Sequence, residues 1–174
     1  MLTFFAQPYD LDAKGFYFST FKEYEEKVKT CINSFGGPVE EFEIMPTDGE
    51  DTKIELVKAA KIDQTNLEDV LDFVENASKD DMVCTFFLMS EHGLSFYDAL
   101  DRKDECIIVE MDIKDAAIEF FDEVYLSEIP QNLRSYIDYD AFVHDFVHDL
   151  EISGDFTEFD YAGSTFTCTN ANAL

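Results

Sequence analysis

Two histidines lie four residues apart in the segment His144-Asp145-Phe146-Val147-His148. A helix would place both imidazoles on one face, which is the arrangement of the zinc-binding sequence HExxH. Aspartate stands where that sequence has its catalytic glutamate, and a side chain one methylene shorter reaches less far toward a metal-bound water. No later histidine can supply a third ligand. We expect no catalytic residue, no metal and no cofactor, and keep a metal-dependent hydrolase using His144 and His148 as a minor alternative.

The other motifs that could support chemistry are incomplete or missing. The segment Asp10 to Gly15 begins like a calcium loop, but Lys14 takes the fifth position and Phe21 takes the twelfth, where a bidentate glutamate is needed. No phosphate-binding glycine loop, dinucleotide-binding glycine pattern or nucleophile elbow occurs. The cysteines form no CxxC pair and are expected to be scattered, buried thiols: Cys31, Cys84, Cys106 and Cys168. The residues therefore favour a protein that is not an enzyme.

Acidic residues dominate the composition, with 39 Asp and Glu against 12 Lys and Arg and a formal net charge of −27. Hydrophobic residues still make up 46% of the chain and 18 residues are Phe, so a folded core is expected rather than disorder. Direct binding to nucleic acid or to anionic membranes is disfavoured, because both would repel such a chain. No apolar run approaches the roughly 18 residues of a membrane span, and the amino terminus lacks the basic and apolar parts of a signal peptide. We expect a cytoplasmic protein.

The acidic residues recur at helical spacing along the chain instead of gathering in one tail. Carboxylates three or four residues apart on a helix lie about 5–6 Å apart at Cβ, comparable to the spacing of phosphates along a DNA strand. The acids that form such rows, and that we expect to mimic phosphates toward a partner, are Glu68, Asp69, Asp72, Glu75, Asp98, Asp101, Glu105, Asp112, Asp115, Glu119, Asp122 and Glu123. A charge of −27 matches about 46 Å of B-form duplex. Such a surface would compete for the basic channel of a DNA-binding enzyme, and the alternative is that the charge serves solubility alone.

The elements that must position these acids are expected to form an elongated α+β protein of three small domains in a row. Residues 1–61 should hold a three-stranded sheet with one helix. Its expected elements are strands over 2–7, 16–18 and 39–45 and a helix from Thr20 to Ile32. A polar stretch over 47–53 marks a boundary region.

The second and third domains are expected over residues 62–103 and 104–174. In the mainly helical middle domain, Thr65 and Glu68 form a capping box before an apolar stripe at helical spacing. The C-terminal domain should be α+β. Its expected elements are a strand over 106–111, helices over 116–125 and 142–150, and strands over 155–161 and 164–168, with breaks at Pro130 and Gly154.

One stretch of the C-terminal region carries a family resemblance. It reads Ile129-Pro130-Gln131-Asn132-Leu133, then Tyr136-Ile137-Asp138-Tyr139 and Ala141-Phe142, and is followed later by Asp149-Leu150 and Ser153-Gly154-Asp155-Phe156. In order and spacing, residues 129–142 resemble the hallmark region of the ArdA family of antirestriction proteins. Between Phe142 and Asp149 this chain carries about one additional helical turn. Weaker similarity covers Tyr9, Gly15 to Phe18 and Glu40 to Ile44, while the family's usual tryptophans are missing, since the chain has none.

The resemblance implies a curved protein of three small domains that mimics bent B-form DNA and often forms a head-to-head homodimer. Such proteins occupy the DNA groove of type I restriction-modification enzymes, in the specificity and methyltransferase core, and block restriction. The family's hallmark region lies near its dimer interface, which would place Leu133, Tyr136, Ile137 and Asp138 there. The runner-up is an acidic decoy for another nucleic-acid enzyme or protein, such as a CRISPR effector or a nucleoid protein.

Overall fold

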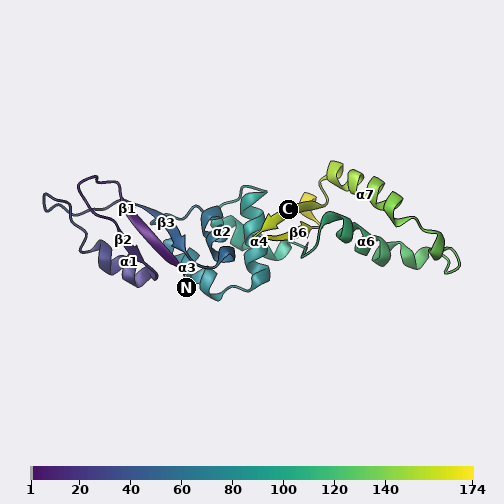
Figure 1. Cartoon of the computed structure of the whole chain (residues 1–174), viewed down its shortest axis with the longest axis horizontal. Coiled ribbons are helices and arrows are strands. Elements are labelled where there is room, and N and C mark those ends of the chain that lie inside the picture. Colours follow the sequence, from purple (N-terminus) through teal and green to yellow (C-terminus); the bar gives the residue numbers. More distant parts are fainter. Residues whose placement is uncertain (1) are drawn as a thin grey trace. The chain divides into compact units, whose positions relative to one another are not determined.

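A computed structural model describes residues 2–174, which form an α+β protein with two three-stranded sheets (Figure 1). The chain divides into two compact units, one up to Asp101 and one from Arg102 to Leu174. The first unit holds both the sheet expected in residues 1–61 and the helices expected in residues 62–103. The boundaries of the three expected domains stay a prediction.

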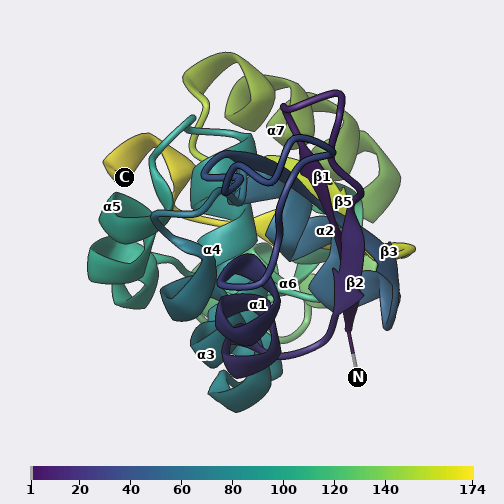
Figure 2. The same cartoon turned by 90° about the vertical axis from the view of Figure 1, so that its left-hand side faces the viewer.

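The first unit begins with an antiparallel sheet in the strand order β2-β1-β3. Its strands are β1 (Thr3–Pro8), β2 (Phe16–Phe18) and β3 (Phe42–Asp48). Alternate side chains of β1 are buried, as a half-covered sheet requires. Helix α1 (Phe21–Val28) lies beside β2 (Figure 2) and is capped by Thr20, whose hydroxyl accepts a hydrogen bond from the Glu23 amide at 3.2 Å. The expected hairpin is confirmed, and a third strand is present, although it runs over Phe42–Asp48 rather than 39–45 and the helix ends before Ile32.

A close approach explains the glycine that opens β2. A Cβ at Gly15 would lie 2.6 Å from the carbonyl oxygen of Ala6 and would also collide with the Phe5 ring. Only glycine therefore lets β2 pair with β1 in this register.

Four helices complete the first unit: α2 (Asp51–Ala59), α3 (Leu67–Asn76), α4 (Lys79–Ser90) and α5 (Phe96–Arg102). The polar stretch 47–53 contains the connection between β3 and α2, although both elements reach into it. One expectation fails here. The capping box is wrong, because Asn66 precedes the first turn of α3 while Asp63 Oδ1 accepts hydrogen bonds from the amide of Thr65 at 2.7 Å and its hydroxyl at 2.6 Å. Thr65 thus belongs to an Asx turn.

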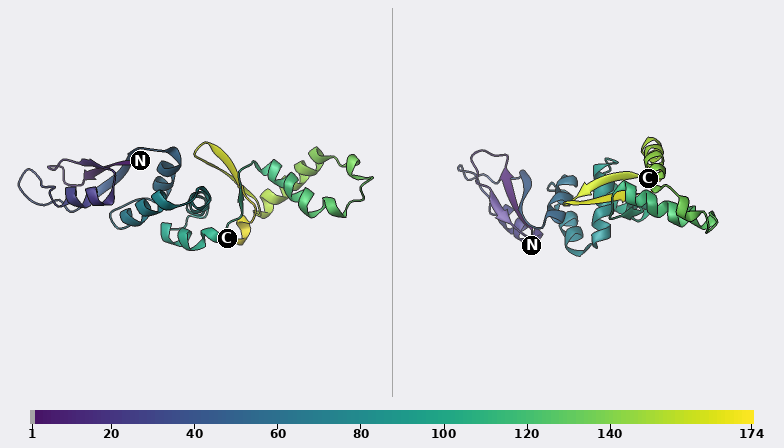
Figure 3. Two further views of the ribbon diagram at one scale, coloured as in Figure 1. Left: turned by 90° about the horizontal axis from the view of Figure 1, so that it is seen from below. Right: turned by 45° about the vertical axis from the view of Figure 1, so that its right-hand side comes forward.

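The second unit joins a helical hairpin to a small sheet in the order β4-β6-β5 (Figure 3). Its main elements are β4 (Ile108–Val109), α6 (Ile113–Val124), α7 (Tyr139–Ser153), β5 (Thr157–Tyr161) and β6 (Ser164–Cys168). Short 3-10 turns cover Lys103–Glu105, Leu126–Glu128, Arg134–Tyr136 and Ala171–Ala173. The expected strand over 106–111 shrinks to the two residues of β4, and Gly154 ends α7 in the left-handed region at φ 72° as expected.

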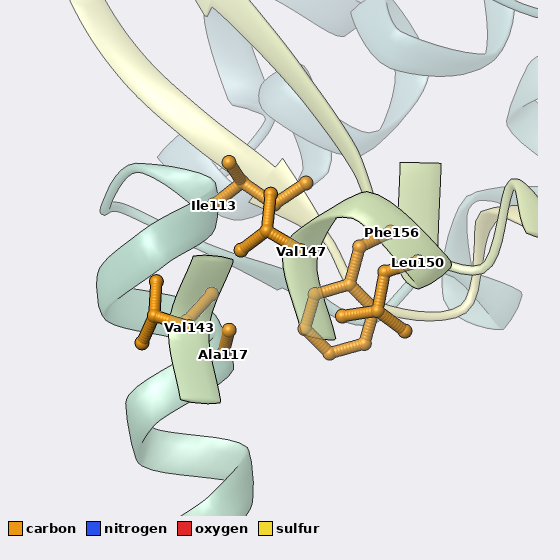
Figure 4. Close-up of a cluster of buried hydrophobic side chains, with 7 residues drawn as sticks. Ile113, Ala117, Val143, Val147, Leu150 and Phe156 are labelled. Carbon is orange, nitrogen blue, oxygen red and sulfur yellow. The ribbon is translucent and has the colours of Figure 1, made fainter. Parts of the chain in front are cut away.

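The core of the second unit lies between its two helices and the start of β5 (Figure 4). Ala117 on α6 is fully buried and lies beside Val143 of α7, while Val147 lies beside Ile113. Phe156 and Leu150 close the cluster toward the sheet. None of the helices in residues 2–174 combines the length and apolar character needed to cross a bilayer.

Candidate functional site

The twelve acids expected to face a partner are all exposed. The buried residues of α3 are Leu67, Val70, Leu71 and Val74, and α6 likewise buries a stripe of apolar residues. Each acidic row therefore stands on the opposite face of a helix that the core holds in place. The sequence pattern thus identified two exposed acidic faces, while their role stays a prediction.

In the first unit, the structure brings the acids of α3 and α5 together. The rings of Phe73 and Phe96 pack edge to face with centroids 5.8 Å apart, which joins the two helices. Beside this contact, the hydroxyl of Tyr97 on α5 donates to Asp69 Oδ2 on α3 at 2.7 Å. Asp69 and Asp98 consequently belong to one surface, although 29 positions separate them in the sequence.

This surface includes a shallow groove of about 340 Å³ between α3 and the start of α1. Four acids line one side, and a short uncharged segment lines the other. The lining residues are Glu68, Asp69, Asp72, Glu75, Leu71, Ser19, Thr20 and Phe21. Among the described residues that line this groove none is basic, so its carboxylates could take up cationic side chains of a partner.

In the second unit, the acidic face is that of α6. Asp115, Glu119 and Glu123 follow one another at four-residue spacing, and Asp122 lies beside them. The hydroxyl of Tyr139, the first residue of α7, donates to Asp122 Oδ1 at 2.7 Å. Each unit thus has the same arrangement, in which the hydroxyl of a tyrosine on a later helix donates a hydrogen bond to an aspartate of the acidic row.

The carboxylates shift the titration of both tyrosines. The hydrogen bond to Asp69 is the main cause that raises the pKa of the Tyr97 hydroxyl above its ordinary value, and the bond to Asp122 raises the pKa of Tyr139 in the same way. A phenolate beside a carboxylate would bring two negative charges together. Both tyrosines therefore remain neutral donors at physiological pH.

Several carboxylates are also fixed by local bonds. Asp72 Oδ1 accepts from the side-chain amide of Asn76 at 3.0 Å, and Asp98 Oδ2 accepts from the hydroxyl of Ser95 at 2.6 Å. Asp112 is the N-cap of α6 and accepts from the Asp115 amide at 2.8 Å. Asp112 is thus partly committed to the helix end and is a weaker candidate for partner binding.

Neutralisation by nearby bases is slight. Among the twelve acids, within the residues the structure describes, Glu105 alone belongs to an ion pair, with Arg102 Nη2 2.9 Å from its Oε2. Neither α3 nor α6 has a basic residue in its last turn. These rows therefore keep their charge and repel themselves within the folded chain.

The histidines lie on the exposed side of α7 and are not joined by further ligands. His144 Nδ1 lies 3.1 Å from Oδ1 of its neighbour Asp145, and both side chains are exposed. A shallow pocket holds His144 and His148 together with Lys114, a cation that disfavours a metal ion beside it. Within residues 2–174 as described, no three His, Cys, Asp or Glu side chains gather as a metal site.

The hallmark region forms an irregular connection between α6 and α7. Leu133 is 49% exposed and Tyr136 is 82% exposed, whereas Ile137 is half-buried. Asp138 is the N-cap of α7, because its Oδ1 accepts from the Ala141 amide at 3.1 Å. Three of the four residues expected at a dimer interface therefore lie on the surface. One of these three, Asp138, also caps α7.

An apolar groove, which sequence reasoning missed, opens beside this region. It has a volume of about 490 Å³ and is lined by Phe121, Tyr125, Glu128, Ile129, Phe142 and Phe146. The guanidinium Nε of Arg134 donates to the carbonyl of Ile129 at 3.0 Å and ties the hallmark region to the groove. The run of aromatic residues at helical spacing on α6 and α7 was the available signal, but it indicated core packing rather than a surface groove.

Comparison of the chain with protein families, curated proteins and solved structures gives no match.

Proposed function

We propose that this protein is a non-enzymatic DNA mimic that occupies the DNA-binding groove of type I restriction-modification enzymes in the host cytoplasm. Its exposed carboxylates would take the places of phosphates in the basic channel of the specificity and methyltransferase core. The observation that carries this proposal is the pair of acidic faces on α3 with α5 and on α6, where uncompensated carboxylates stand on rigid helices. The resemblance of residues 129–142 to the ArdA hallmark region supports the choice of target.

Phosphate mimicry requires carboxylates whose positions are fixed before binding. The hydrogen bonds from Tyr97 to Asp69 and from Tyr139 to Asp122 provide such fixing in each unit. Carboxylates that are already ordered lose less side-chain entropy when the partner's Arg and Lys side chains close on them. Binding would also release counterions from both surfaces, so its strength should fall as salt rises.

The proposal is tested by cleavage of unmodified DNA by a purified type I enzyme. The protein should suppress cleavage at low salt, and suppression should weaken as salt is added. Parallel assays on a CRISPR effector and on a nucleoid protein separate restriction from the alternative targets. If the protein inhibits only the CRISPR effector or the nucleoid protein, the type I assignment is rejected and the hypothesis of an acidic decoy stands. If it inhibits none of the three, DNA mimicry is rejected.

We also propose a homodimer through the hallmark region. The apolar groove beside it and the exposed side chains of Leu133 and Tyr136 supply a mainly apolar surface, in which Glu128 is charged. Two chains of net charge −27 need such a surface in order to approach. Replacing Leu133 and Tyr136 by Ser should convert a dimer to a monomer in sedimentation velocity. A wild-type monomer, or an unchanged dimer in the variant, would contradict this interface.

A further inference from the structure

Strand β5 forms an open edge of the sheet in the second unit. In the strand order β4-β6-β5 it has β6 on one side, and no strand of the described residues pairs with its other side. Figure 3 shows the hairpin of β5 and β6 in yellow, extending away from α6 and α7. The strand has five residues without proline and pairs with β6 without a bulge. It therefore offers regular backbone groups to a further strand.

The other edge strands of the two sheets are short or blunted. Strand β2 has three residues and β4 has two. Strand β3 contains Pro46, and its Phe42 amide already donates to Oε1 of Gln64 at 2.8 Å. Short strands, proline and covering side chains are common ways in which proteins protect a sheet edge. Among the strands described, β5 is thus the edge best suited to bind another strand.

The turn that closes the hairpin determines which backbone groups of β5 point outward. Ala162 and Gly163 have φ values of 51° and 80°, which are typical of a two-residue type I′ turn. Tyr161, directly before this turn, forms a hydrogen-bonded pair with β6, and bonded and non-bonded pairs alternate along the strand from there. Glu158 and Asp160 therefore direct their backbone amides and carbonyls away from β6.

The two residues with outward backbone groups also make this edge acidic. Both side chains are exposed. Glu158 Oε2 accepts from the Ile113 amide at 2.8 Å, and Asp160 Oδ1 accepts from the Thr165 hydroxyl at 2.8 Å, so both carboxylates are held in position. Neither carboxylate belongs to an ion pair of the described residues, and residues 153–174 contain three acids and no base. The charge of the edge is therefore complementary to a basic strand.

We propose that the β5 edge binds an extended basic segment of a partner protein, which adds to the sheet as a fourth, antiparallel strand. Backbone hydrogen bonds would form at Glu158 and Asp160. The residues opposite them, two positions apart on the segment, would be Lys or Arg, whose side chains lie beside the two carboxylates. This inference goes beyond DNA mimicry, because it concerns the backbone of a strand outside both acidic faces.

A second copy of the chain is the less favoured occupant of this edge. Antiparallel pairing of two β5 strands about a two-fold axis at Phe159 would set Glu158 of each copy opposite Asp160 of the other. Like charges directly opposite each other destabilise a sheet, whereas opposite charges stabilise it. The same two acids thus oppose pairing of the chain with itself and favour a basic strand.

The proposal is tested by NMR hydrogen exchange on the full-length protein, with a nonapeptide of alternating Lys and Thr as the probe. In the free protein, the amides of Glu158 and Asp160 should exchange faster than those of Phe159 and Tyr161, which face β6. Near saturation, the peptide should slow exchange at Glu158 and Asp160 by at least about fivefold.

A control peptide separates strand addition from general attraction, because a chain of net charge −27 attracts any basic peptide. The control has the same sequence with an N-methyl group on each Lys amide. It keeps the charge but cannot donate hydrogen bonds from the residues that place Lys beside the acids. We expect it to bind at least about fivefold more weakly.

Two variants at one position separate the backbone amide from the carboxylate. Asp160→Pro removes the outward amide, at an edge position where proline is tolerated, whereas Asp160→Ala keeps it. Both variants lose the same charge and the same bond to Thr165. The Pro variant should bind the unmodified peptide about five- to tenfold more weakly than the Ala variant.

Equal binding of the two peptides, equal binding by the two variants, or unchanged exchange at Glu158 and Asp160 near saturation would each overturn the proposal. Slow exchange at these amides without peptide, together with a dimer in sedimentation velocity that Asp160→Pro abolishes, would assign the edge to a second copy and also overturn it. If the Pro variant fails to fold, the two peptides on the wild-type protein decide. None of these outcomes depends on displacement of DNA, so DNA mimicry stands or falls separately.

Discussion

Tyr97 and Tyr139 connect the chemistry of single residues to the acidic faces. Each hydroxyl donates to an aspartate at 2.7 Å, and in each case the carboxylate raises the tyrosine pKa. A raised pKa in the folded state means that the contribution to stability is fully present below the ordinary tyrosine pKa. This contribution is lost as pH rises through the raised pKa. These two hydrogen bonds should therefore make the free energy of unfolding fall at alkaline pH.

The variants Tyr97→Phe and Tyr139→Phe should therefore release Asp69 and Asp122 without changing net charge at neutral pH. We expect each to weaken binding to the target by about two- to fivefold, because a mobile carboxylate must be ordered on binding. Competition binding measures the effect, with Tyr17→Phe as the control, since Tyr17 is 60% exposed and lies on β2, outside the acidic rows. In Asp69→Asn, the Tyr97 pKa measured by NMR titration should move back toward its ordinary value. Equal affinity of all the Phe variants would show that these bonds do not prepare the surface.

Asp112 can be tested for a structural role that is distinct from partner binding. Its side chain caps α6, so Asp112→Ala should lower the free energy of unfolding by about 1 kcal/mol, whereas Asp112→Asn keeps the cap and should cost only a few tenths. Urea unfolding measures both changes. If the Asn variant is as unstable as the Ala variant, the capping hydrogen bond is not the source of the lost stability. The source is then the negative charge of Asp112 at the start of the helix.

At the scale of elements, the acidic row of α6 can be tested as a unit. Replacing Asp115, Glu119 and Glu123 by Lys leaves the bond between Tyr139 and Asp122 in place and reverses the exposed face. We expect inhibition of the target to weaken by at least about tenfold and the salt dependence of binding to become shallower, because several ionic contacts are lost.

The matched control for this row lies on α7. Asp140, Asp145 and Asp149 are also exposed, and their replacement by Lys changes the net charge by the same amount. An equal loss of inhibition in both triple variants would mean that total charge matters and the α6 face does not. Retained inhibition in the α6 variant would remove that face from the binding surface.

The elements predicted well from the sequence are those with a strong apolar period. The stripe on α3 and the alternation in β1 follow from burial of one face, and Gly154 stops α7 because it takes the left-handed conformation. The start of α3 was mispredicted because Asp63 captured Thr65 in a local turn that competes with capping. Helix α2 was missed because its polar first turn resembles a linker.

The parts of the candidate site that depend on distant residues could not be read from local patterns. Tyr97 reaches Asp69 across 28 positions, and Glu158 Oε2 on β5 accepts from the Ile113 amide at 2.8 Å across 45 positions, at the start of α6. Periodicity could place the acids on exposed faces, but it carries no signal for which side chains meet between elements. The apolar groove beside the hallmark region depends on tertiary structure in the same way.

At the scale of the whole molecule, salt should act on folding and on binding with opposite signs. The chain carries −27, and most acids of its rows have no basic partner among the described residues, so repulsion destabilises the folded state. Raising ionic strength from about 0.01 M to about 0.15 M shortens the screening length from about 30 Å to about 8 Å and should raise the urea midpoint. The urea midpoint should rise less with added salt in the variant that replaces Asp115, Glu119 and Glu123 by Lys. A midpoint that falls with salt would show that attractive ion pairs dominate the fold instead.

Competition between the protein and a specific DNA duplex for the type I specificity–methyltransferase core tests the central claim most directly. Fluorescence anisotropy of labelled duplex would follow its release as protein is added, at about 50 mM and about 200 mM salt. We predict complete and competitive displacement at the lower salt, with an apparent affinity for the protein that falls steeply at the higher salt. Duplex that stays bound at saturating protein, or displacement that does not depend on salt, would contradict DNA mimicry.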